Sequence, residues 1–289
     1  MSKRRQHFAA HKGTIRCAAW GKKYGGLFAT GGEDHVVNVW RLGHVHALKT
    51  LDSLFTSPVS ALVFNTNETK LAAATDGGTI RIYDFENDKV IRTLNGHLTE
   101  CTSLHFHPFA SNYLISTSRD NNLKVWDLRE RKCMNTFRGH TDAVLCSQFS
   151  PDGRLVATGG ADACVKVWDL TKGQKLASFG GDRSKVDKRY AHRGPVTDLA
   201  FHPFEFVLAS TCDADRSAKL WDLESYTLLD TAPGITGQRA LKRPRVMLGD
   251  EMLCFGSAGV RVYPLDSRTC SLSHKAKPLQ VACDWDTGV

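Results

Sequence analysis

Histidine, aspartate and a hydroxyl-bearing residue recur together in this chain, and that combination can support nucleophilic catalysis. A carboxylate that orients a histidine lets the imidazole activate a neighbouring hydroxyl group. In two copies a tryptophan completes the set: His97, Ser116 or Ser118, Asp120 and Trp126, and then His140, Thr158 or its neighbour, Asp162 and Trp168. Whether these residues act chemically or structurally depends on the elements that carry them.

Other catalytic and metal-binding signatures are absent from the sequence. No Gly-x-x-x-x-Gly-Lys-Ser/Thr loop is present to bind nucleotide phosphates, and neither a Gly-x-Ser-x-Gly turn nor a His-Glu-x-x-His helix occurs. The pairs His44 with His46 and His105 with His107 could each face one side of a strand. Zinc needs a third protein ligand, and the sequence nominates none. We therefore expect a protein that is not an enzyme and has no cofactor or metal.

A periodic aromatic residue defines the elements. A tryptophan or tyrosine closes a strand-like run at Trp40, Tyr83, Trp126, Trp168, Trp221 and Tyr263. The steps between them are 43, 43, 42, 53 and 42 residues. This period is that of a WD40 β-propeller, in which each repeat supplies one four-stranded blade.

The copy that ends at Trp168 shows the pattern most clearly. Alternating runs predict strands at 143–149, 154–158, 164–168 and 175–179. The first two are joined by Ser-Pro-Asp-Gly, in which proline presets φ and glycine accepts a positive φ. One repeat therefore predicts a four-stranded antiparallel sheet.

The repeats fill the chain, so we expect one all-β WD40 propeller domain over residues 1–289. The predicted repeats lie at about 10–52, 53–95, 96–138, 139–180, 191–232 and 233–273. A seventh, incomplete blade is expected from 277–289 together with an N-terminal strand at 6–10, and a missing continuation of the chain would explain why it is short. The second repeat has Ser57-Pro58 in place of Gly-His and Tyr83 in place of tryptophan. Its polar network should be incomplete.

The recurring polar residues resemble the WD40 network, in which histidine, aspartate, a hydroxyl group and the indole bond in series. Each such hydrogen bond contributes only about 1 kcal/mol net, whereas a buried orphaned partner costs ~1–3 kcal/mol. We therefore interpret His97, Asp120, Trp126, His140, Asp162 and Trp168 as structural.

Composition indicates where such a protein works. Hydrophobic residues make up 42% of the chain, which is enough for a core. The nine cysteines are odd in number and include no Cys-x-x-Cys pair, which is typical of small buried thiols in a reducing compartment. No signal peptide or run of ~20 apolar residues is present. The expected location is the cytoplasm, with no membrane partner.

Several segments are more particular than the general repeat: 27–40 (LFATGGEDHVVNVW), 104–108 (LHFHP), 201–210 (FHPFEFVLAS) and 261–263 (RVY). They resemble the propeller of the p80-type, regulatory WD-repeat subunit of katanin, the microtubule-severing ATPase, over nearly the whole chain. The resemblance implies a non-catalytic scaffold of the cytoskeleton that binds microtubules at the centrosome or spindle pole and targets or regulates the severing ATPase. In that family a C-terminal helical domain binds the katanin catalytic subunit. These residues contain no such domain, so ATPase binding in that manner is not implied for them.

The net charge of +8 is concentrated before two of the repeats. The first cluster lies between the fourth and fifth blades: Arg183, Lys185, Lys188, Arg189 and Arg193. The second cluster lies at the entry to the sixth blade: Arg239, Lys242, Arg243 and Arg245. Loops that lead into successive blades emerge on one face of a propeller, so both clusters should form one basic patch. Tubulin is acidic, and we expect this patch to bind microtubules unless the residues are only solvated loop charges.

Two other partners fit parts of the sequence. Nucleic acid is also acidic, but the basic stretches lack interleaved aromatic residues, so we do not expect it to bind. The run Trp126-Asp127-Leu128-Arg129 resembles the motif with which some propellers dock on the adaptor of cullin-type ubiquitin ligases as substrate receptors. Only Arg129 adds to what the repeat itself requires, so this function is the alternative.

Overall fold

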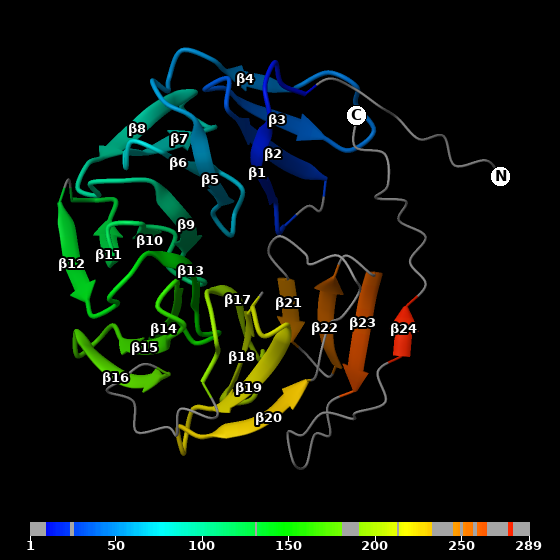
Figure 1. Ribbon diagram of the computed structural model, residues 1–289. Coiled ribbons are helices and arrows are strands. Elements are labelled where there is room, and N and C mark those ends of the chain that lie inside the picture. The colour runs from blue at the N-terminus through cyan, green and yellow to red at the C-terminus, as the bar shows by residue number, and fades with distance from the viewer. Residues whose placement is uncertain are drawn as a thin grey trace. The chain divides into compact units, whose positions relative to one another are not determined.

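The computed structural model describes residues 10–23, 26–130, 132–180, 191–212 and 214–232, and the backbone of four later strands. The chain divides into two compact units, Met1–Gly139 and His140–Val289. Each consists of consecutive four-stranded antiparallel sheets (Figure 1). The described residues form strands and turns without a helix, which confirms the predicted all-β propeller class. None of them therefore belongs to a helix able to cross a membrane.

The first unit contains three sheets. The first is formed by β1 (Ile15–Trp20), β2 (Leu27–Gly32), β3 (Val37–Arg41) and β4 (Lys49–Leu51). The second is formed by β5 (Val59–Phe64), β6 (Lys70–Thr75), β7 (Ile80–Asp84) and β8 (Lys89–Leu94). The third is formed by β9 (Cys101–Phe106), β10 (Tyr113–Ser118), β11 (Asn122–Asp127) and β12 (Cys133–Arg138). In all three, each strand pairs with the next along the chain.

The second unit repeats this arrangement. Its first sheet is formed by β13 (Val144–Phe149), β14 (Leu155–Gly160), β15 (Val165–Asp169) and β16 (Gln174–Phe179). The next is formed by β17 (Val196–Phe201), β18 (Val207–Cys212), β19 (Ser217–Asp222) and β20 (Leu228–Ala232). The last is formed by β21 (Arg245–Leu248), β22 (Glu251–Gly256), β23 (Gly259–Pro264) and β24 (Lys277–Leu279).

Tight turns between strands set this topology. The Ser-Pro-Asp-Gly turn between β13 and β14 closes with a hydrogen bond from Gly153 N to Ser150 O of 2.9 Å. Gly153 has a φ of 74°, a conformation that glycine adopts without a steric penalty. The turn chemistry predicted for this repeat is therefore the chemistry the structure uses.

The core lies between neighbouring sheets within each unit. Ile80 and Ile82 of β7 are fully buried and pack in one cluster with Leu104 and Trp126 of the following sheet. A second cluster joins the first two sheets, and in the other unit a third joins the sheets that begin with β13 and β17. Because the large side chains fill the space between sheets, each repeat is stabilised mainly by its neighbours.

One boundary prediction is wrong. Residues 277–279 do not begin a seventh blade: β24 pairs antiparallel with β23, with Val260 opposite Leu279, and completes the sixth sheet. The connection between Pro264 and Lys277 is longer than the matching connections in the other sheets, so the fourth strand comes later than the period predicts. The other parts of the predicted seventh blade, 6–9 and 280–289, lie outside the described residues, and Ala10 is not in a strand.

Candidate functional site

The histidine, aspartate and hydroxyl residues of the third repeat form one buried hydrogen-bonded series. His97 Nδ1 lies 2.8 Å from Asp120 Oδ2, and its Nε2 lies 2.7 Å from Ser116 Oγ. Trp126 Nε1 donates to the same Ser116 oxygen at 2.8 Å. Ser116 is therefore the hydroxyl of this network. Ser118, the other candidate, contacts Thr99.

The fourth repeat has the same geometry with threonine in place of serine. His140 Nδ1 lies 2.9 Å from Asp162 Oδ1, and its Nε2 lies 2.8 Å from Thr158 Oγ1. Trp168 Nε1 donates to that oxygen at 2.8 Å. A β-carbon placed on Gly160 would lie 2.5 Å from His140 Nδ1, so glycine leaves room for the imidazole.

Two further networks were not named from the sequence, although the same spacing identifies them. In the first repeat the members are His11, Thr30, Asp34 and Trp40. In the fifth they are His192, Ser210, Asp215 and Trp221. Their signal is a histidine followed by the hydroxyl 18 or 19 residues later, and by the carboxylate 22 or 23 residues later.

The donors and acceptors of each network run in one direction. The indole N–H donates to the hydroxyl oxygen, the hydroxyl donates to Nε2, and Nδ1–H donates to the carboxylate. Burial lowers the pKa of His97 and His140, which keeps both imidazoles neutral. Burial is the largest single influence on Asp162 and opposes its ionisation. The hydrogen bonds from His140 and from the backbone N–H of Thr141, together with the charges nearby, outweigh burial and lower the pKa of this carboxyl group.

This arrangement has the members of a catalytic triad but not the accessibility of one. Ser116 and Thr158 are fully buried, and each hydroxyl oxygen already accepts an indole N–H. A nucleophile must reach substrate, so these hydroxyl groups cannot attack one without the loss of the core tryptophan packing. The geometry instead supports a structural role, in which these hydrogen bonds hold the strands of one sheet together.

The second repeat lacks the network as a unit. The ladders align Val59–Thr75 with Val144–Gly160, and this register places Phe55, Ala73, Gly77 and Tyr83 where the other repeats have histidine, hydroxyl, aspartate and tryptophan. The predicted incompleteness is present, but Phe55 rather than Ser57-Pro58 takes the histidine position. The Tyr83 hydroxyl donates instead to Asp88 in the turn between β7 and β8. When donor and acceptor are replaced together, no buried polar group is orphaned.

One group of three candidate metal ligands occurs among the described residues: His192, Cys212 and Asp215, whose ligand atoms lie within 4.8 Å of one another. Both ring nitrogens of His192 are hydrogen-bonded, to Asp215 at 2.9 Å and to Ser210 at 2.7 Å. A metal ion would have to replace one of these bonds in a fully packed network. The group is therefore explained by the network.

Arg129 is exposed but held within its own repeat. Its side chain is 61% exposed, and its Nε lies 3.0 and 3.1 Å from the two carboxylate oxygens of Asp127. Its Nη2 donates to Asp127 Oδ2 at 2.6 Å and to the Tyr113 hydroxyl at 2.7 Å. These hydrogen bonds lower the pKa of Asp127. The guanidinium group is thus fixed in orientation with one edge in solvent.

The two basic clusters lie mostly outside the described residues. Arg193 is described: it is exposed, and its backbone N–H donates to Asp215 Oδ2 at 3.3 Å. Arg245 is the first residue of β21. The structure describes none of the remaining seven: Arg183, Lys185, Lys188, Arg189, Arg239, Lys242 and Arg243. The predicted basic patch stays a prediction.

Comparison with known proteins agrees with the repeats. The family model "WD domain, G-beta repeat" matches residues 2–41, 47–84, 88–127, 131–169 and 183–222. The chain is 28% identical over 253 residues to nuclear distribution protein PAC1 of Arthroderma otae, which covers 78% of this chain and 53% of that protein. It is 28% identical over 235 residues to nuclear distribution protein nudF of Aspergillus niger, covering 75% and 52%.

A third relative has a different name. Pre-mRNA-processing factor 19 of Bos taurus is 32% identical over 174 residues, or 60% of this chain and 32% of that protein. The chain therefore spans about half the length of the first of these relatives and less of the third. The matched repeats cover most of the chain, and each contains the first three strands of one of the first five sheets. The chain therefore belongs to the WD40 repeat family.

Proposed function

We propose that this chain is a non-catalytic interaction scaffold that binds microtubules and targets or regulates a microtubule-severing ATPase. The observation that carries the scaffold role is the burial of the Ser/Thr–His–Asp sets. In these sets, which have the composition of a catalytic triad, the hydroxyl group is buried and accepts a hydrogen bond from a tryptophan, so substrate cannot reach it. We therefore infer that partners bind the surface of the protein.

The charge of that surface supports an acidic partner. The net charge is +8. The first basic cluster precedes β17 and the second extends to the first residue of β21, and these two strands of neighbouring sheets contact each other. Arg193, the last residue of the first cluster, is solvent-exposed beside the buried His192. A surface of one sign raises the rate of encounter with a partner of the opposite sign, such as the acidic surface of a microtubule.

The katanin-type role is the finer form of this proposal and rests on the four segments at 27–40, 104–108, 201–210 and 261–263. PAC1, nudF and pre-mRNA-processing factor 19 are named for nuclear distribution and for pre-mRNA processing instead. The cytoplasmic, microtubule-associated location belongs to the same proposal. Binding of the ATPase subunit requires a further site, so the first test concerns microtubules alone.

Co-sedimentation with microtubules at increasing salt tests the proposal. We expect the protein to pellet with microtubules at low ionic strength and to be released as salt screens the charges, because the screening length falls to about 8 Å at 0.15 M. A variant with Arg183, Lys185, Lys188 and Arg189 changed to Glu should bind more weakly and lose most of the salt dependence. A Lys242→Glu, Arg243→Glu variant should behave in the same way.

The matched control carries charge reversals at Lys172 and Lys175. Both lysines are exposed. Lys172 lies in the turn between β15 and β16, and Lys175 is the second residue of β16, at the end of that strand opposite the connection to β17. This control should bind like the unmodified protein. Equal binding by the control and by both cluster variants, with an unchanged salt dependence, would remove the basic patch from the proposal.

The alternative function, a substrate receptor of a cullin-type ligase, is favoured by the orientation of Arg129. A guanidinium group that is 61% exposed and fixed by Asp127 is suited to contact an adaptor. Arg129→Ala should then abolish capture of the adaptor in a pull-down, whereas Arg154→Ala, which removes a side chain that is 79% exposed, should not. Adaptor capture that depends on Arg129, without microtubule binding, would reverse the order of the two proposals.

A further inference from the structure

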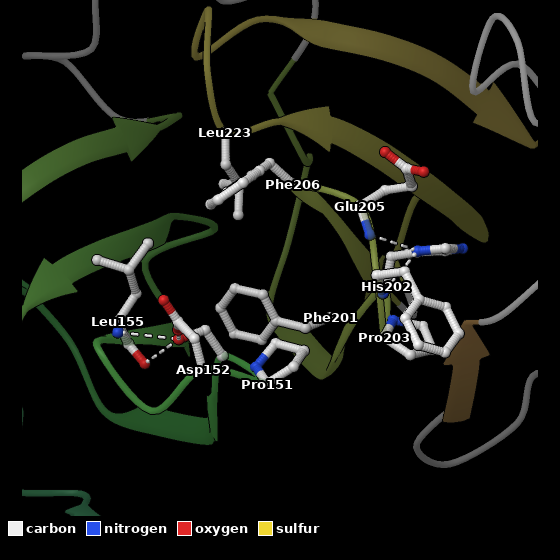
Figure 2. Close-up of a pocket in the computed structure, with 11 residues that line it drawn as sticks. Pro151, Asp152, Leu155, Phe201, His202, Pro203, Glu205, Phe206 and Leu223 are labelled. Carbon is white, nitrogen blue, oxygen red and sulfur yellow. Dashed lines mark hydrogen bonds between the residues drawn. The ribbon is translucent and has the colours of Figure 1, made fainter.

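A pocket of about 120 Å³ lies between two neighbouring sheets of the second unit. It is formed by the turn between β13 and β14 and the turn between β17 and β18 (Figure 2). Figure 2 shows Leu223 and Phe206 on one side of the pocket and Phe201 next to Pro151 on the other. The second of these turns follows β17, whereas Arg193 precedes that strand, so the pocket lies at the opposite end of β17 from this exposed residue of the first basic cluster.

The fifth repeat forms one wall of the pocket with the turn between β17 and β18, and hydrogen bonds fix the conformation of this turn. His202 is buried, and its Nδ1 accepts hydrogen bonds from the backbone N–H groups of Phe204 at 3.2 Å and Glu205 at 2.9 Å. The turn is tied at both ends, by His202 N to Val207 O at 2.9 Å and by Leu223 N to Phe206 O at 2.8 Å. The side chains it presents are therefore ordered before any partner binds, which reduces the entropic cost of binding.

Two phenylalanines of this turn are exposed to water. Phe204 is 87% exposed and Phe206 is 58% exposed, although both line the pocket. A single exposed apolar residue is ordinary, but two exposed aromatic residues that line one apolar pocket are typical of an interaction site. Burial of this surface by a partner would supply the hydrophobic part of the binding free energy.

The third repeat provides a comparison, because its sequence also reads Phe-His-Pro-Phe. His107 Nδ1 accepts from Phe109 N at 3.2 Å and Ala110 N at 3.0 Å, and Phe109 is 76% exposed. The two residues after this phenylalanine are Ala110 and Ser111, whereas the fifth repeat has Glu205 and Phe206. The turn itself is thus common to both repeats, and the carboxylate and the second aromatic residue are particular to the pocket.

The charge at the pocket is acidic. Asp152 and Glu205 line it from opposite turns, and no lysine, arginine or other carboxylate is among the lining residues. The Asp152 side chain is 47% exposed. Its Oδ1 accepts from Ser150 Oγ and Arg154 N, and Arg154 Nε forms an ion pair with Oδ2 at 3.9 Å, too long for a hydrogen bond, so Oδ2 can still accept one. A basic group of a partner would therefore meet two carboxylates at the rim of an apolar depression.

The volume limits what can enter. Pockets for drug-sized ligands and cofactors measure about 300–1,000 Å³, whereas a cavity of about 150 Å³ holds benzene. The present pocket accommodates one aliphatic side chain. We propose that it docks a short segment of a partner protein that inserts a leucine or isoleucine and carries a lysine or arginine beside it.

Fluorescence anisotropy with three labelled peptides of equal length tests this docking site. Each peptide has one central leucine, flanked by lysines, by serines or by glutamates. The lysine-flanked peptide should bind most tightly and the glutamate-flanked peptide least. Replacement of its leucine by alanine should weaken binding by about tenfold or more, because the anchor loses most of its buried apolar surface.

Variants of the protein locate the binding. Phe204→Ser and Phe206→Ser should abolish it, whereas Phe109→Ser, in the matching turn of the third repeat, should leave it unchanged. The double variant Asp152→Asn, Glu205→Gln should lower affinity for the lysine-flanked peptide by about fivefold, the effect of two exposed charge pairs. It should leave the serine-flanked peptide unaffected.

Three results would overturn the proposal. They are equal affinity for all three peptides, an equal loss on Phe109→Ser, and self-association of the protein that Phe204→Ser removes while no peptide binds. The last result would assign the surface to a second copy of the chain. Each outcome is independent of microtubule co-sedimentation, because the pocket variants do not alter the basic clusters.

Discussion

The indole of Trp168 and the imidazole of His140 meet at one hydroxyl group. Trp168 Nε1 and His140 Nε2 each lie 2.8 Å from Thr158 Oγ1, which therefore joins two side chains that do not contact each other through their own polar atoms. Loss of any member leaves another buried polar group without a partner. The networks should for this reason respond to mutation as units rather than as sums of separate hydrogen bonds.

Removal of a network tryptophan should destabilise the fold strongly. Trp126→Ala and Trp168→Ala each delete a large buried side chain and an N–H donor, and we expect a loss of ~3–5 kcal/mol in the free energy of unfolding. Urea titration measures this loss. Trp20→Ala is the control, because Trp20 is 57% exposed, and it should cost less. An unchanged melting temperature in either core variant would contradict the burial of these indoles.

The second repeat predicts that the network can be replaced as a whole. A variant of the fourth repeat with His140→Phe, Thr158→Ala, Asp162→Gly and Trp168→Tyr copies the residues at the matching positions of the second. Each single change orphans a buried partner, whereas the four together remove these partners as a set and leave only the new tyrosine hydroxyl in need of an acceptor. The quadruple variant should be more stable than the sum of the four single losses predicts, by about 1–3 kcal/mol.

Denaturant titration of the four single variants and the quadruple variant makes this comparison. Additive losses would mean that the hydrogen bonds act independently. The Tyr83 hydroxyl is bonded outside the network position, to Asp88, so the quadruple variant also needs an acceptor for its new tyrosine. Gly173, which takes the position of Asp88 in the fourth repeat and also has a positive φ, can be changed to Asp to supply one.

Stability should fall as the pH is lowered below neutrality. Burial lowers the pKa of His97, His140 and His192 relative to the unfolded value of 6.5, so the unfolded chain binds protons more readily than the folded one. The stabilisation is complete above pH 6.5 and is lost progressively as the pH falls below that value toward the lower folded pKa. Melting temperatures measured between pH 8 and pH 5 should decrease over the acid part of this range.

The carboxylates extend the same trend to lower pH. The pKa of Asp162 is lowered from 3.8, so its contribution is present above that pH and is lost as the pH falls further. A variant with an altered network provides the control: the quadruple variant of the fourth repeat lacks one histidine and one aspartate and should show a shallower decrease. A melting temperature that rises on acidification would contradict the neutral state assigned to these histidines.

Cysteine reactivity should be selective. Burial raises the pKa of Cys17 and Cys101 to about 12 and that of Cys164 to about 11, so these thiols hold few reactive thiolates at neutral pH. Cys133 is only partly buried. Mass spectrometry after brief treatment of the folded protein with iodoacetamide should find Cys133 alkylated before those three. Cys17 is partly buried as well, so its raised pKa rather than its accessibility should protect it. Simultaneous labelling of all four in folded protein would contradict the raised pKa values of the three thiols.

Local patterns explain why much of the fold was predictable. Alternation and turn residues such as Ser150 and Gly153 act over a few neighbours, so they set strands and hairpins wherever they occur. The period of Trp40, Trp126 and Trp168 then identified the repeats. The prediction failed at 277–279, because a longer connection after Pro264 breaks the period and only strand pairing shows which sheet receives the strand.

The sequence by itself determined the all-β class, the repeat and most members of the buried networks, since these depend on residues at fixed separations in one repeat. Only the tertiary structure selected Ser116 over Ser118. The two serines are two residues apart on one strand, so both side chains point to the same face of the sheet. Only the position of the His97 ring in the folded protein decides that it bonds to Ser116, while Ser118 bonds to Thr99. Strand register likewise showed that Phe55 takes the histidine position. The pocket joins turns about fifty residues apart, and its exposed phenylalanines acquire meaning only when packing brings those turns together.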